Sequence, residues 1–199
     1  APAACKEAPV TVDLRAEGEH PAGSKTFEAT DAVARRVAIL PGEMAFDPAD
    51  LSGLEKKAGV TPLALYTLYL ADFEIPRADL SGVGFGQITP AKGQTVGAIT
   101  IVPLDEGGFA EGDTATDGEV GYELTTTLTP VGVTVFADGD TTGQAYTDTT
   151  GQVEILQLDD KTICMDFDLT FENQGETVYA AKGTVLAPVV RSADAFFYT

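Results

Sequence analysis

The stretch Ile163–Phe171, ICMDFDLTF, decides the fold of this 199-residue chain. Apolar side chains stand at every second position of it, and smaller or polar ones stand between them. The apolar set is Ile163, Met165, Phe167, Leu169 and Phe171, and the other set is Cys164, Asp166, Asp168 and Thr170. Successive side chains of a β-strand point to opposite faces, so this alternation predicts a strand with one face in the core and the other toward water.

Similar stretches lie on both sides of this strand. Val153–Leu158 precedes it across a turn at Asp159–Lys161, and Thr177–Leu186 follows it across a turn at Glu172–Gly175. Further strands are expected at Leu63–Ile75, Val96–Val102, Val120–Leu128, Val131–Ala137 and Gln144–Thr147, and Phe196–Tyr198 forms a last edge strand or a hydrophobic latch. No helical pattern recurs between them, so the sequence predicts a mainly β fold, an antiparallel β-barrel or β-sandwich of about eight strands.

The N-terminal third departs from this pattern. Residues 1–26 form a polar segment with a short strand candidate at Val10–Leu14, and residues 27–199 form a single β domain. Thr30 or Asp31 can cap a short helix through AVARRVAI, although Val33–Leu40 also suits a strand. A second short helix is predicted from Asp47, with Pro48 in its first turn, to Gly59. We therefore expect one or two short helices in this third.

Charge excludes several functions. The chain has 12 Lys and Arg against 31 Asp and Glu, a formal net charge of −19. A phosphate backbone repels such a chain, so nucleic acid is not an expected partner. No apolar run reaches the roughly 18 residues of a membrane-spanning helix, so no transmembrane segment is predicted. Between Gly93 and Asp160 there are 13 acidic residues and no Lys or Arg, a density that fits a salty, calcium-containing or cation-presenting medium outside the cell.

One acidic loop has the composition of a calcium site. Ca²⁺ prefers carboxylate and carbonyl oxygens on a glycine-containing loop. The loop DGDTTGQAYTD offers Asp138, Asp140, Thr142 and Asp148, whereas the twelfth position of an EF-hand loop holds Thr149 instead of Glu. Ca²⁺ is therefore the one cofactor that the sequence suggests, and the alternative is a solvated hairpin turn.

The two cysteines are far apart and lack metal-binding spacing. In an oxidising compartment, a disulfide between Cys5 and Cys164 would pin the N-terminal segment to the core, and the alternative is two unpaired thiols. The chain opens with APAAC, which we interpret as a mature N-terminus left by removal of a signal peptide. Both features predict an extracellular or cell-surface location.

No catalytic residues are predicted. The one histidine, His20, lies in the polar stretch GEHPAG, where an orienting partner is not expected. Asp166 and Asp168 share a strand face and could in principle act as an acid–base pair, but the favoured interpretation is the wet face of an amphipathic strand.

Four stretches carry a resemblance to a known group of domains. They are Thr150–Ile155 (TGQVEI), Leu158–Ile163 (LDDKTI), Asp166–Phe171 (DFDLTF) and Lys182–Val185 (KGTV). With them, residues 87–190 resemble the calycin-like β-barrel domains of secreted or surface-anchored bacterial proteins. Met165 departs from the pattern, which has a small Gly at that place. The resemblance implies a barrel architecture and a location outside the cell.

These observations favour a non-enzymatic binding module that is secreted or held at the cell surface. Its partner would be an unknown small molecule or protein, contacted through loops or a barrel mouth. The alternative is a structural subunit of an extracellular assembly, such as a surface layer, filament or adhesin, that self-associates and is stabilised by Ca²⁺. A carboxylate-dependent carbohydrate-active enzyme ranks last.

Overall fold

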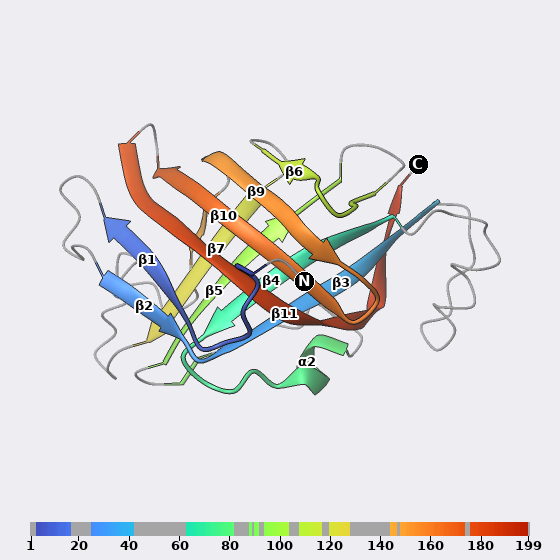
Figure 1. Cartoon of the computed structure of the whole chain (residues 1–199), viewed down its shortest axis with the longest axis horizontal. Coiled ribbons are helices and arrows are strands. Elements are labelled where there is room, and N and C mark those ends of the chain that lie inside the picture. Colours follow the sequence, from blue (N-terminus) through green and yellow to red (C-terminus); the bar gives the residue numbers. More distant parts are fainter. Residues whose placement is uncertain are drawn as a thin grey trace.

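The computed structural model describes residues 3–16, 25–41, 63–81, 88, 90–91, 94–103, 108–116, 120–127, 144–146, 148–173 and 176–198. Apart from one short helix, the regular elements in these ranges are strands (Figure 1). They are β1 (Val10–Ala16), β2 (Lys25–Ala29), β3 (Asp31–Pro41), β4 (Ala64–Ala71), α2 (Arg77–Ser81), β5 (Gln94–Ile101), β6 (Thr114–Ala115), β7 (Val120–Thr127), β8 (Gln144–Tyr146), β9 (Asp148–Leu158), β10 (Thr162–Asn173) and β11 (Glu176–Tyr198).

The strands form one curled sheet in the order β6-β9-β10-β11-β3-β4-β5-β7-β8, and β1 pairs with β11 and with β2. In Figure 1, β9, β10 and β11 cross in front of β4, β5 and β7. The predicted mainly β fold is therefore confirmed, as a sheet curled into a half-barrel. The described ranges hold more strands than the eight or so expected, because short strands such as β6 and the hairpin β1–β2 add to the count.

One pairing corrects the expectation of a purely antiparallel fold. The first half of β11 runs antiparallel to β10 as far as Pro188, and its second half, from Val189 to Tyr198, runs parallel to β3. At 23 residues, β11 is long enough to serve two partners in turn. The segment Phe196–Tyr198 is the end of this strand, paired with Ile39–Pro41.

The inner face of the curled sheet is filled with side chains. Ile163, Met165, Phe167 and Leu169 are at most 1% exposed and pack with residues of β4, β5, β9 and β11 in one apolar cluster. The alternation predicted for β10 is thus confirmed at these positions. Gly183 lies opposite Phe167, and a Cβ there would stand 2.9 Å from the Phe167 ring, so the missing side chain makes room for the ring.

A second apolar cluster covers the outer face of β3, β4 and β5. It joins Val33, Ala71 and Val96 of these strands to Ile75 and Leu80, which lie before and within α2. The strand β3 is consequently buried on both faces, with Ala32 and Ala34 in the inner cluster. A strand covered on both faces loses the alternation of polar and apolar residues.

This double burial explains an incorrect prediction. The helix expected through AVARRVAI is wrong, and the strand alternative is confirmed, because these residues form β3. The helix expected over Asp47–Gly59 and the strand expected at Val131–Ala137 lie outside the described residues. The short helix α2 was not predicted. In the part of the chain that the structure describes, no helix is long and apolar enough to cross a membrane.

Gly151 provides a test of the β9–β10 register. Its φ is +104°, and a Cβ built there would lie 2.1 Å from the carbonyl oxygen of Asp168 on β10. Replacement by Ala adds backbone strain and a clash with main-chain atoms, so G151A should lower the free energy of unfolding by about 2–4 kcal/mol. The matched control is G112A, because Gly112 also has a positive φ (+91°) but no atom within 4 Å of its would-be Cβ. This control should cost only about 1 kcal/mol. Urea denaturation measures the loss in the free energy of unfolding for both variants. Equal losses would contradict the close contact between Gly151 and Asp168.

Candidate functional site

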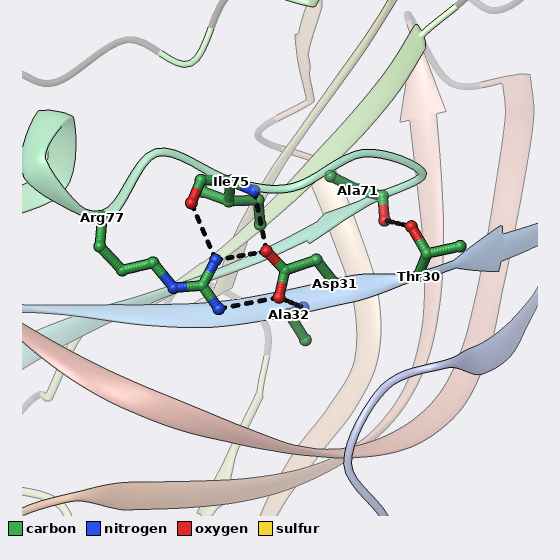
Figure 2. Close-up of polar contacts among 6 residues, drawn as sticks. All are labelled: Thr30, Asp31, Ala32, Ala71, Ile75 and Arg77. Atoms are coloured by element: carbon green, nitrogen blue, oxygen red, sulfur yellow. Dashed lines mark hydrogen bonds and ion pairs between the residues drawn. The ribbon is translucent and has the colours of Figure 1, made fainter.

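The most elaborate polar arrangement in the described residues surrounds Asp31, the first residue of β3 (Figure 2). Arg77 binds this carboxylate in a bidentate way with both terminal nitrogens. Nη2 donates to Oδ1 at a distance of 2.8 Å, and Nη1 donates to Oδ2. Two main-chain amides complete the set, from Ala32 to Oδ1 at 2.9 Å and from Ile75 to Oδ2 at 2.8 Å. Arg77 Nη1 also donates to the carbonyl of Ile75 at 2.8 Å. Asp31 therefore fastens the segment before α2 to the start of β3.

These contacts set the charge state of the pair. Partial burial acts to raise the pKa of Asp31, but hydrogen bonds from Arg77 and from the amides of Ile75 and Ala32, with the positive charge of Arg77, outweigh it and lower the pKa. The hydrogen bond to Asp31 is the main cause that raises the pKa of Arg77. The carboxylate and the guanidinium thus stay ionised at neutral pH.

A cleft opens beside this ion pair. One cavity, of about 220 Å³, lies between the N-terminal segment, the start of β3 and the bend of β11, and is lined by Glu7, Ala8, Thr30, Asp31, Ala32, Arg77, Thr162, Leu186 and Pro188. An adjoining and more open hollow, of about 520 Å³, is lined by Thr30, Asp31, Glu74 and Arg77. Because the two share three residues, they form one continuous surface, which we call the Asp31 cleft.

The Asp31 cleft has an excess of negative charge. It contains the carboxylates of Glu7, Asp31 and Glu74 against the guanidinium of Arg77. Asp31 already accepts four hydrogen bonds, so it is a fixed part of the wall. Glu7 lines the smaller cavity, Glu74 lines the more open hollow, and both are exposed. With the hydroxyls of Thr30 and Thr162 they offer oxygen acceptors to a bound group.

The predicted calcium residues are only partly visible. Asp138, Asp140 and Thr142 lie outside the described residues, and Asp148 is the first residue of β9, in register with Glu172. Within the described ranges, no three acidic, histidine or cysteine side chains are grouped so that they could hold a metal ion. The calcium site stays a prediction. His20 also lies outside the described residues.

The aspartates of β10 lie on its outer face and have partners in β11. Asp166 accepts a hydrogen bond from the hydroxyl of Thr184, and the exposed Asp168 forms an ion pair with Lys182 at 3.5 Å. These contacts are cross-strand pairs of an ordinary sheet surface. Cys5 and Cys164 are joined in a disulfide with a Cα–Cα distance of 5.9 Å, which fits the pairing predicted from the sequence.

The sequence indicates only part of the Asp31 cleft. It offered Thr30 or Asp31 as a residue whose side chain accepts main-chain amides at a helix start; Asp31 does accept main-chain amides, but at the start of a strand. The partner Arg77 is 46 residues away, and the pattern around it holds no signal for that pairing. Comparison of the chain with models of protein families, with curated protein sequences and with solved structures finds no match. The calycin-like resemblance therefore stays a prediction.

The ion pair has a measurable signature in pH dependence. A carboxylate whose folded pKa is lowered stabilises the fold above its ordinary pKa of 3.8, and this contribution is lost as the pH falls through the folded value. D31N should therefore lower the free energy of unfolding at pH 7 by about 1–2 kcal/mol, a moderate figure because the Arg77 side chain is 40% exposed. The difference in the free energy of unfolding between D31N and the native protein should shrink below about pH 4.

The control for this experiment is D79N, which removes an exposed carboxylate from the first turn of α2. It should leave the free energy of unfolding within about 0.5 kcal/mol of the native value and should not change how that free energy falls at acid pH. Urea unfolding at a series of pH values measures all three proteins. A D31N variant as stable as D79N would show that the ion pair does not hold the segment before α2.

Proposed function

We propose that this chain is a non-enzymatic binding module of the extracellular space or cell surface, and that the Asp31 cleft is its binding site. The observation that carries the proposal is the cleft itself, a concave surface lined by the Asp31–Arg77 ion pair and by two exposed glutamates, Glu7 and Glu74. Binding sites are commonly clefts with a few well-placed polar groups on a rigid scaffold.

Two features favour binding over catalysis. The carboxylate of Asp31 has its hydrogen-bonding capacity engaged and a lowered pKa, whereas a general acid needs a pKa near the working pH. The inner face of the sheet is filled by the side chains of Phe167, Leu68 and Ile99, so a ligand is expected at the surface of the fold and not in its interior.

The charge of the cleft indicates the chemistry of the ligand. Three carboxylates against one guanidinium leave a net negative charge, within a chain whose formal charge is −19. A negative cleft on a negative protein attracts cations and repels anions. We therefore expect the ligand to carry a primary ammonium or guanidinium group, as a basic peptide does.

The proposed location rests on the disulfide and on features of the sequence. A disulfide is stable in an oxidising compartment, which suits a secreted or surface protein. The calycin-like resemblance of residues 87–190 and the acidic composition point in the same direction, and both are features of the sequence.

A cationic probe tests the binding function directly. Tetralysine should bind the native protein at low ionic strength, with an affinity that falls as salt is added, because exposed charges are screened. The double variant E7Q/E74Q should bind about tenfold more weakly, from roughly 0.7 kcal/mol for each lost ion pair. Isothermal titration calorimetry gives both affinities.

The matched control is E111Q/E154Q, which removes two carboxylates outside the cleft, one from an exposed turn and one from the outer face of β9. It alters the total charge equally and should leave the affinity within about twofold of the native value. Absence of tetralysine binding, or equal losses in the two double variants, would overturn the cleft as a cation site.

The alternative function, a subunit of an extracellular assembly, is favoured by the strand β2. Among the described strands, β2 pairs only with β1, so its other edge presents main-chain groups that a neighbouring chain can extend. Sedimentation velocity over a wide range of protein concentration distinguishes the two. The binding module should remain monomeric without its ligand, and growth to oligomers would favour the assembly.

A further inference from the structure

The segment Ala3–Pro9 lies as a strap across the bend of β11, and we call it the N-terminal strap. Its Cys5 is bonded to Cys164 of β10, and its Lys6 carbonyl accepts a hydrogen bond of 2.8 Å from the Leu186 amide. Glu7 forms a β-bridge with Leu186. Ala8 packs against the inner apolar cluster. The strap thus meets the sheet just before β11 turns from β10 to β3.

Cys164 shows that the N-terminal strap covers an apolar part of the outer sheet face. By alternation along β10, Cys164 points outward, as do Asp166 and Asp168, yet it is 0% exposed while Asp168 is exposed. Its opposite residue on β11, Leu186, is half-buried and shares that outward direction. The strap is bonded to both residues, so it is what shields them from water.

The N-terminal strap is also one wall of the Asp31 cleft. Glu7 and Ala8 line the smaller cavity together with Thr30, Asp31 and Arg77. If the strap left the sheet, this cavity would lose its wall. The position of the strap therefore sets the shape and charge of the cleft.

Apart from the disulfide, the contacts of the N-terminal strap within the described residues are one main-chain hydrogen bond, one β-bridge and the packing of Ala8. Five of its seven residues are exposed, namely Ala3, Ala4, Lys6, Glu7 and Pro9. Segments with few buried apolar contacts open at low free energy. The sheet beneath does not need the strap, because β10 is paired with β9 and β11 along its length and β1 pairs separately with β11 and β2.

We propose that the Cys5–Cys164 disulfide is a redox-operated latch: it holds the N-terminal strap as a wall of the Asp31 cleft, and its reduction releases the strap while the sheet stays folded. The reductant is a dithiol. One of its thiolates attacks the sulfur of Cys5, which is partly exposed, and Cys164 leaves as a thiolate and takes up a proton. The second dithiol sulfur then closes its own disulfide and frees Cys5, so two electrons and two protons pass from the dithiol to the cystine.

Hydrogen exchange of two amides on β11 tests the latch. The Leu186 amide donates to Lys6 in the N-terminal strap, whereas the Val189 amide, three residues on, donates to Lys161 at 2.7 Å and is independent of the strap. After reduction with dithiothreitol, exchange at Leu186 should accelerate at least tenfold, and exchange at Val189 should stay within about twofold of its rate in the oxidised protein.

Two outcomes overturn the proposal. Unchanged protection at Leu186 would show that the strap stays docked without its disulfide, and equal loss at both amides would show that the disulfide is a staple of the whole fold. The variant C5S gives the same comparison without reductant. Its Cys164 should react with N-ethylmaleimide at a rate set by local opening, faster than the unfolding rate measured in urea.

The consequence for binding is measured separately, because it rests on the proposed function. Reduced protein should bind tetralysine more weakly than oxidised protein, by about the effect of E7Q alone, since Glu7 leaves the cleft with the strap. If the oxidised protein does not bind tetralysine, the cation site fails and the latch is still decided by the exchange at Leu186 and Val189.

Discussion

The bend of β11 is the feature on which the rest of the structure depends. A single strand of 23 residues joins an antiparallel set, β9 and β10, to a second set that begins with β3. A strand that changes partners leaves main-chain groups near the change without a sheet neighbour. Pro188, which has no amide proton, ends the pairing with β10, the Val189 amide is taken by the Lys161 carbonyl, and the Leu186 amide is taken by the N-terminal strap. The cavity lies at this changeover because the sheet cannot be continuous there.

The Asp31–Arg77 pair solves a second problem created by the same topology. The strand β3 is central, so its outer face must also be covered, and the segment from Ala71 to α2 covers it with Ile75 and Leu80. This segment has main-chain amides that no strand satisfies. Asp31 accepts the Ile75 amide, and Arg77 supplies the Ile75 carbonyl with a donor, so the ion pair replaces a missing strand neighbour.

How far the sequence predicts the fold depends on whether a signal is local. In β10 each face has one environment, so the alternation of Ile163–Phe171 identifies the strand. In β3 both faces are buried, and the spacing of Val33 and Val37 then resembles a helix. The parallel pairing of Val189 with Ala34 and the contact of Arg77 with Asp31 join distant positions, and no residue type marks their partners. The Cys5–Cys164 pair is an exception among long-range contacts. The chain has only two cysteines, so only one intrachain disulfide is possible.

Among the described acidic residues, several aspartates and the two glutamates of the cleft serve different purposes. Asp31, Asp113 and Asp159 accept main-chain amides from nearby turns or strands, and the amides of Lys161 and Thr162 lower the pKa of Asp159. A short carboxylate reaches its own turn easily, so aspartate serves structure here. Glu7 and Glu74 are longer and exposed, and they line the cleft beside the fixed pair. In the cleft, the charge that is open to a partner is therefore carried by Glu7 and Glu74. Because Glu7 stands on the disulfide-bonded strap, the proposed latch ties the acidity of the cleft to the oxidation state of Cys5 and Cys164.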